Sequence, residues 1–82
     1  MDIIDFLKQR RSTSDPELTR RIDEVIFRVE NPCFRDLLIR HYIEGQSCRE
    51  IADELFFSIR HVKRLLSRAR NAADIVYNDF YK

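Results

Sequence analysis

The chain has 82 residues, of which 44% are hydrophobic and 35% are charged, with one glycine, two prolines and a net charge of +1. This length allows one domain and leaves no room for a catalytic core beside a regulatory domain. The composition argues against disorder and favours helices over strands, so we expect an all-α fold. A single glycine also excludes a glycine-rich phosphate loop.

The charge is divided unevenly along the chain. Residues 1–57 carry nine Lys or Arg and twelve Asp or Glu, a net charge of −3, whereas residues 58–82 carry six and two, a net charge of +4. A basic C-terminal segment on an acidic body fits local phosphate binding, because the acidic part discourages unspecific adhesion.

The N-terminal part of the chain predicts a pair of helices. Apolar residues cluster partly in residues 2–9, and the polar residues 10–14 interrupt this pattern as a loop would. Asp15 and Pro16 then combine an N-cap residue with a proline at the first helical position, which predicts a second helix running to about Glu30.

A third predicted helix begins with the same combination of an N-cap residue and a proline, here Asn31 and Pro32. Gly45, the only glycine, stands where the left-handed residue at the end of a helix is expected. Only Gly45 and Gln46 separate this helix from the next cap, which should hold the two helices together. The predicted core-facing residues of the third helix are Phe34, Leu37, Leu38 and Tyr42.

The following stretch predicts a helix-turn-helix. Ser47 and Glu50 form the S-x-x-E capping box of a short helix, and Ser58, another preferred N-cap residue, begins a second helix eleven residues later. This spacing leaves room for about two helical turns and a tight connection, the pattern in which a second helix enters the DNA major groove. In the connection, we expect Phe57 in the core and Phe56 at least partly exposed.

The second helix of this motif has two faces at about 100° per residue. From Ser58 to Ala73 it carries five cations and no acid, a charge of +5. The apolar face comprises Ile59, Val62, Leu65, Leu66, Ala69, Ala72 and Ala73. The opposite face comprises Arg60, Arg64, Ser67 and Asn71, flanked by His61 and Arg68 on one side and by Lys63 and Arg70 on the other.

This polar face predicts contacts with double-stranded DNA, although a merely solvated cationic face is the alternative. Arg60 and Arg64 can each make bidentate hydrogen bonds to guanine O6 and N7, so we assign them to base reading. Ser67 and His61 are further base-reading candidates, and His61 could equally be only exposed. The candidates for phosphate binding are Ser47, Arg49, Ser58, Lys63, Arg68 and Arg70. For Ser47 and Ser58, helix capping is the simpler role.

The pattern L-L-x-x-x-Y-x-E-G-x-S-x-x-E-I-A-x-x-L-x-x-S-x-x-x-V-K-x-x-x-x-x-A, from Leu37 to Ala69, resembles the fourth region of bacterial sigma factors. It resembles even more the small phage and mobile-element transcriptional regulators that carry such a region. The similarity covers about 33 of the 82 residues. It implies a trihelical DNA-binding unit in which the residues two and six positions after the second serine cap, here Arg60 and Arg64, reach into the major groove.

The chain departs from this family at three positions. Phe56 stands where a glycine is common, Ile59 stands where a basic residue is common, and Arg60 replaces an acid of the housekeeping factors. The usual promoter element of that family is therefore not the expected target.

We expect one domain over residues 1–82, with about five helices: an N-terminal helical pair in residues 1–30, packed on a trihelical helix-turn-helix core in residues 32–78. After Ala73 the last helix either runs on to about Asn78 and packs on the N-terminal helices, or forms a dimer contact.

The predicted function is sequence-specific binding of double-stranded DNA as a transcriptional regulator, without catalysis. One alternative is a subunit of a phage packaging or recombination complex. Another is a sigma-like adaptor that binds RNA polymerase or another regulator instead of DNA. A homodimer stays open.

Cys33 and Cys48 form neither a CxxC pair nor a finger-like spacing with histidines, so we expect no metal site and no cofactor. No secretion signal or membrane-spanning stretch is recognisable in the sequence. Reduced thiols and a cytoplasmic location are therefore expected.

Overall fold

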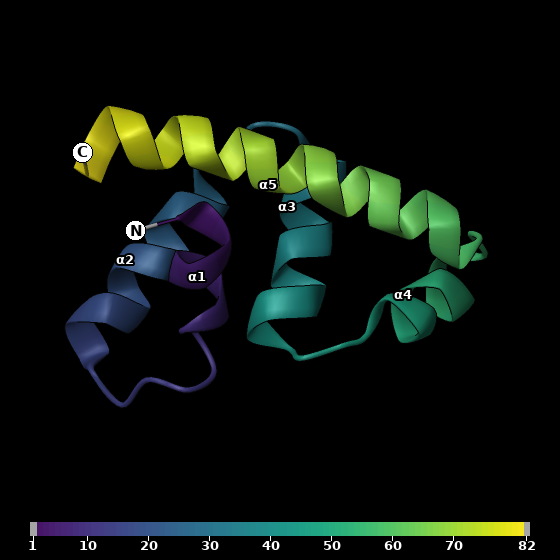
Figure 1. The fold of residues 1–82 in the computed structure, drawn as a ribbon, viewed down its shortest axis with the longest axis horizontal. Coiled ribbons are helices and arrows are strands. Elements are labelled where there is room, and N and C mark those ends of the chain that lie inside the picture. The colour runs from purple at the N-terminus through teal and green to yellow at the C-terminus, as the bar shows by residue number, and fades with distance from the viewer. Residues whose placement is uncertain (1, 82) are drawn as a thin grey trace.

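The structure, a computed structural model, describes residues 2–81 and consists of helices joined by short connections (Figure 1). The helices are α1 (Ile3–Lys8), α2 (Pro16–Phe27), α3 (Pro32–Leu38), α4 (Cys48–Leu55) and α5 (Ile59–Tyr81), and a π-helical segment, η1 (Ile39–Ile43), continues α3. The predicted all-α fold of about five helices is confirmed.

Four of the five α-helices begin with a side-chain N-cap. In each case the oxygen of an N-cap side chain accepts a hydrogen bond from a backbone amide in the first turn, which satisfies a group that the helix itself leaves unpaired. The backbone amide of Glu17 donates to the Asp15 side chain at 3.0 Å, and the amides of Cys33 and Phe34 donate to the Asn31 side chain at 2.9 and 3.3 Å. The amide of Glu50 donates to the Ser47 hydroxyl at 3.2 Å, and the amide of His61 donates to the Ser58 hydroxyl at 3.0 Å.

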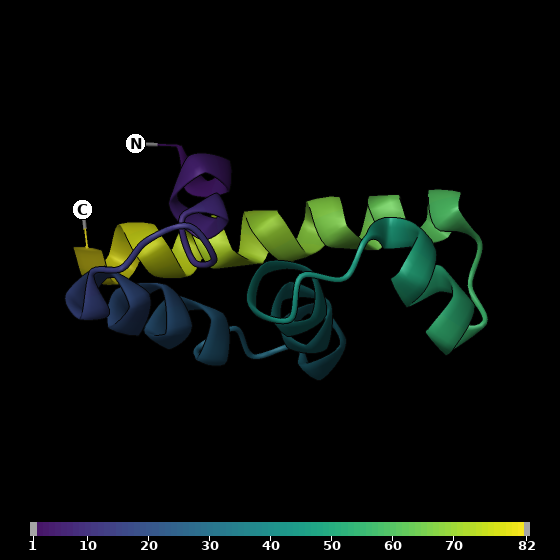
Figure 2. The same cartoon turned by 90° about the horizontal axis from the view of Figure 1, so that it is seen from below.

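The longest helix, α5, organises the packing. It lies across the other helices, with α1 and α2 against its C-terminal half, α3 near its middle and α4 against its N-terminal half (Figures 1 and 2). One hydrophobic cluster draws residues from all five α-helices and from η1. The buried residues of α5 in this cluster are Val62, Leu66, Ala69 and Ala73.

The C-terminal half of α5 packs on the N-terminal helices, as the first of the two alternatives predicted, and the helix extends to Tyr81. The rings of Phe6 and Tyr77 lie 4.7 Å apart between their centroids. The Tyr81 hydroxyl donates a hydrogen bond to the Glu24 carboxylate. This bond lowers the pKa of Glu24 and raises the pKa of Tyr81, because it stabilises the charged carboxylate and the neutral phenol.

Two connections contain a residue with positive φ. Gly45, after η1, has φ +78°, in agreement with its predicted left-handed conformation. Phe56, after α4, has φ 58°, a region that L-residues other than glycine rarely adopt. The residue is 94% exposed, as expected. Two predictions at this turn are wrong: Phe57 is 39% exposed instead of buried in the core, and Ile59 is 40% exposed despite its place on the apolar face.

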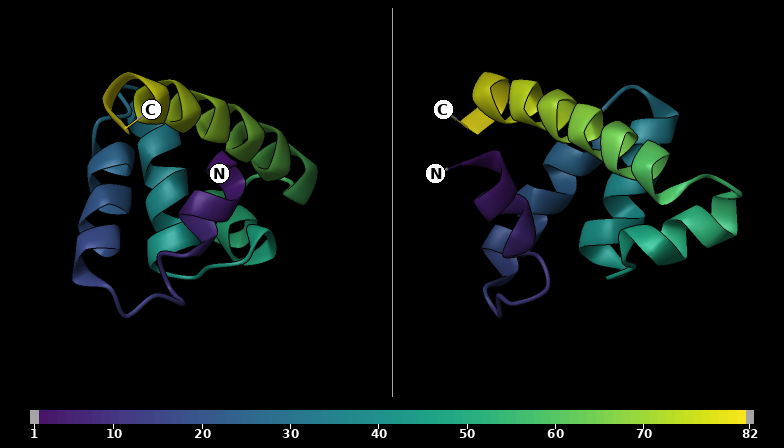
Figure 3. Two further views of the ribbon diagram at one scale, coloured as in Figure 1. Left: turned by 60° about the vertical axis from the view of Figure 1, so that its left-hand side comes forward. Right: turned by 45° about the vertical axis from the view of Figure 1, so that its right-hand side comes forward.

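The two ends of the described chain lie together, and the α4–α5 turn lies at the opposite end of the molecule (Figures 1 and 3). Within residues 2–81, no helix has both the length and the apolar character needed to cross a membrane.

Candidate nucleic-acid interface

The first half of α5 is held by its apolar face, which leaves its polar face outward. Val62 and Leu66 are buried, and α4 contributes the buried residues Ile51 and Ala52 to the same cluster. Ala52 is small, which allows close approach of the two helices. This packing fixes the direction of the side chains on the opposite face of α5.

The outward face carries the predicted base-reading and phosphate-binding residues of α5. The exposed ones are Arg60, Lys63, Arg64, Ser67 and Arg68. Within residues 2–81, none of the four cations among them forms an ion pair with an acid. Their charges are therefore not neutralised by neighbouring carboxylates.

Four arginines in the rest of the molecule, by contrast, form ion pairs with acids. Such pairs compensate charge locally. The pairs are Arg10 with Asp23 at 2.7 Å, Arg20 with Glu17 at 2.6 Å and Glu24 at 2.5 Å, Arg21 with Glu17 at 3.4 Å, and Arg40 with Asp36 at 2.8 Å and with Glu54. The hydrogen bond to Asp36 is the main cause of a raised pKa of Arg40.

The predicted backbone-contact residues outside the cationic face lie at helix starts. Ser47 and Glu50 complete the capping box, because the Glu50 carboxylate also accepts a hydrogen bond from the Ser47 amide at 3.2 Å. Arg49 is exposed in the first turn of α4. Ser58 caps α5 and is exposed as well. Both serines therefore have the capping role that the sequence favoured.

Two of the predicted site residues are only half-exposed and contact other side chains. The Arg70 Nε donates a hydrogen bond to the Tyr42 hydroxyl at 2.5 Å, and the Arg70 guanidinium lies 5.8 Å from the centre of the Tyr42 ring. The His61 ring packs edge-on against Phe57, with 4.8 Å between centroids and 88° between planes. Arg70 thus links α5 to η1, a contact that the sequence pattern did not reveal.

The chain matches no protein-family model, and no curated protein or solved structure is significantly similar to it.

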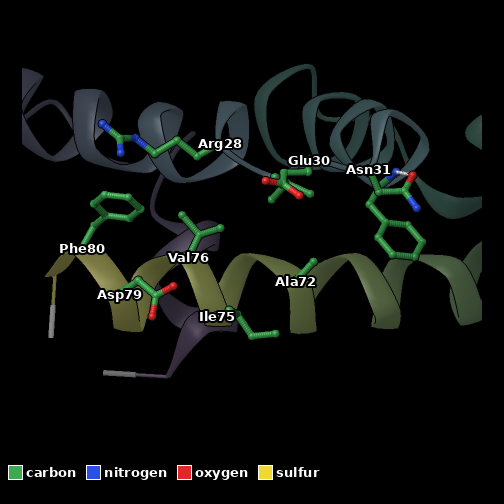
Figure 4. A pocket seen from close by; sticks show the side chains of 10 residues that line it. Arg28, Glu30, Asn31, Ala72, Ile75, Val76, Asp79 and Phe80 are labelled. Carbon is green, nitrogen blue, oxygen red and sulfur yellow. Dashed lines mark hydrogen bonds between the residues drawn. The ribbon is translucent and has the colours of Figure 1, made fainter.

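A groove of about 630 Å³ lies on the other half of α5, between this helix and the connection from α2 to α3 (Figure 4). Its lining includes Phe34, Val76 and Phe80, and the Arg28 guanidinium lies 4.1 Å from the centre of the Phe80 ring. The cations of the outward face do not line it. In the part of the chain that the structure describes, no group of three or more His, Cys, Asp or Glu could hold a metal ion, and both cysteines are free thiols.

Proposed function

We propose that the protein binds double-stranded DNA through the outward face of the first half of α5 and acts as a transcriptional regulator. The observation that carries this proposal is the gathering of four exposed cations on this face, none of which pairs with an acid within residues 2–81, whereas four arginines of the body form ion pairs. A helix is about 10 Å across and the major groove is about 12 Å wide, so a cationic helix with one free face can enter it.

In this proposal Arg60 and Arg64 read bases. Four residues along a helix correspond to about 6 Å, which is close to the separation of two base pairs stacked at about 3.4 Å. The two guanidinium groups would therefore reach guanines about two base pairs apart. Ser67 and His61 would contact neighbouring base edges.

The phosphate contacts in this proposal flank the base-reading residues. Lys63 and Arg68 lie on the two sides of the row of Arg60 and Arg64, so they would meet the two backbones that border the groove. Arg49, together with the amides at the helix starts capped by Ser47 and Ser58, would add contacts from α4 and from the end of α5. Arg70 would hold α5 against Tyr42 with its Nε and offer only its remaining donors to a phosphate.

Selection of bound duplexes from a random pool, followed by fluorescence anisotropy on the selected site, tests the proposal. Arg60→Ala or Arg64→Ala should weaken binding to the selected site by about 5- to 150-fold, the equivalent of about 1–3 kcal/mol, and relax the preference at one base pair. Arg21→Ala is a matched control, since it removes the same charge from the opposite part of the molecule. Unchanged affinity of both α5 variants for the selected site would refute the assignment.

The same experiment separates the alternatives. A palindromic consensus would indicate a homodimer, and a single half-site would indicate a monomer or an adaptor that acts with RNA polymerase. A large stable oligomer in light scattering would favour a packaging or recombination complex. Absence of any salt-dependent shift of duplex DNA would refute DNA binding and leave the adaptor that contacts a protein.

A further inference from the structure

An apolar tip precedes the cationic face of α5. It consists of Phe56, Phe57 and Ile59, which are 94%, 39% and 40% exposed. Phe57 packs against the ring of His61, whereas Phe56 extends into solvent almost completely. Exposed apolar side chains that gather at one place commonly mark a contact surface.

The fold of the chain itself does not account for a phenylalanine at position 56. The amides of Phe56 and Phe57 both donate to the carbonyl of Ala52, which closes α4 with a left-handed residue at Phe56. Glycine is the usual residue in this geometry, because any Cβ approaches the backbone too closely there. Phe56 thus carries backbone strain without gaining burial, and a contact outside the chain would explain why this residue is present.

The position of the tip beside the cations of α5 indicates which kind of partner it contacts. Ile59 is the first residue of α5, directly before Arg60 and one helical turn before Lys63, on the segment that the proposed function places against base edges. A partner that covers the tip must also accommodate these exposed cations, and the phosphates of DNA do so. The major groove presents one apolar group, the C5-methyl group of thymine.

We propose that Phe56 and Ile59 contact thymine methyl groups, so that the target site combines guanines with adjacent thymines. This inference rests on the proposed function and adds the base preference to it. The consensus selected from a random pool should therefore contain thymine beside the guanines that Arg60 and Arg64 read.

Replacement of thymine by deoxyuridine in the selected duplex tests the inference, because it removes only the methyl group. Each contacted thymine should lose about fourfold in affinity when replaced, which corresponds to about 0.8 kcal/mol for one buried methyl group. The measurement is a titration by fluorescence anisotropy at constant salt, one thymine replaced at a time.

Two variants connect the effect to the tip. Ile59→Ala should weaken binding to the thymine duplex and abolish the difference between thymine and deoxyuridine at one position. Phe56→Gly should do the same at another position, while raising the midpoint of thermal unfolding because the left-handed strain is relieved. Phe80→Ala is the matched control: it removes an exposed aromatic ring near the far end of α5 and should leave both the affinity and the deoxyuridine effect unchanged.

Equal affinity for thymine and deoxyuridine duplexes, or a selected consensus without thymine, would overturn the inference. So would a Phe56→Gly variant that keeps its DNA affinity and loses binding to RNA polymerase, since the tip would then belong to a protein contact. In these cases DNA binding that is still lost in Arg60→Ala would support the proposed function. A wild-type protein that binds no duplex would overturn both.

Discussion

Under the proposed function, the salt dependence of DNA binding measures how many phosphates the protein neutralises. Each neutralised phosphate changes the slope of log affinity against log salt concentration by about −0.9 for duplex DNA. Three exposed cations assigned to phosphates, Arg49, Lys63 and Arg68, therefore predict a slope of about −2.7. Between about 50 and 200 mM salt, the affinity should fall about 40-fold.

The variant Lys63→Ala should reduce this slope to about −1.8, so that affinity falls only about 12-fold over the same range. Its affinity should drop for all duplex sequences alike, because phosphates carry no sequence information. Arg21→Ala, which loses the same charge from α2, should keep the slope of the wild type. The assay is fluorescence anisotropy at five or more salt concentrations, and an equal change of slope in both variants would refute the reasoning, since net charge alone would then explain it.

Three further predictions concern the fold that holds the outward face. Gly45→Ala should lower the free energy of unfolding in urea by about 1–2 kcal/mol, because φ is +78° there and a Cβ would lie 2.1 Å from Nη1 of the flexible Arg11 side chain; no loss would contradict this. Leu66→Ala should lower the free energy of unfolding by about 2–5 kcal/mol in the same assay, since it opens a cavity under α5. A decrease below about 1 kcal/mol would contradict this, because neighbouring side chains would then have filled the cavity. The lowered pKa of Glu24 gives stability that is present above its ordinary value of 4.5 and is lost as pH falls. Tyr81→Phe should therefore reduce the drop in melting temperature between about pH 6 and pH 3, and an unchanged drop would argue against the hydrogen bond.

Helix starts were predictable from the sequence because they depend on neighbouring residues. Asp15, Asn31, Ser47 and Ser58 each accept a backbone hydrogen bond within their own first turn, so the N-cap pattern was sufficient. The same holds for Gly45, whose left-handed conformation follows from its position after a helix.

The exposure of the apolar residues at the α4–α5 turn was not predictable from neighbouring residues alone. A helical wheel places Ile59 on the apolar face, but at the first residue of α5 that face extends beyond the core and the side chain is left 40% exposed. Phe57 was expected in the core for its size and hydrophobicity, and instead packs on His61 at the surface.

The sequence by itself determined that the chain is all-α, where four of its five α-helices begin, and that the first half of α5 carries cations on one face. Ion pairs three or four residues apart, such as Arg20 with Glu24, follow from spacing along one helix. Only the tertiary structure decided which cations contact side chains distant in sequence. Arg40 of η1 forms an ion pair with Glu54 of α4, and Arg70 donates a hydrogen bond to Tyr42, 28 residues away. Arg60 and Arg64 form no ion pair with an acid within residues 2–81. Capping and ion pairs between residues three or four apart act over a single turn, whereas contacts such as Arg40 with Glu54 require the packed arrangement of different helices.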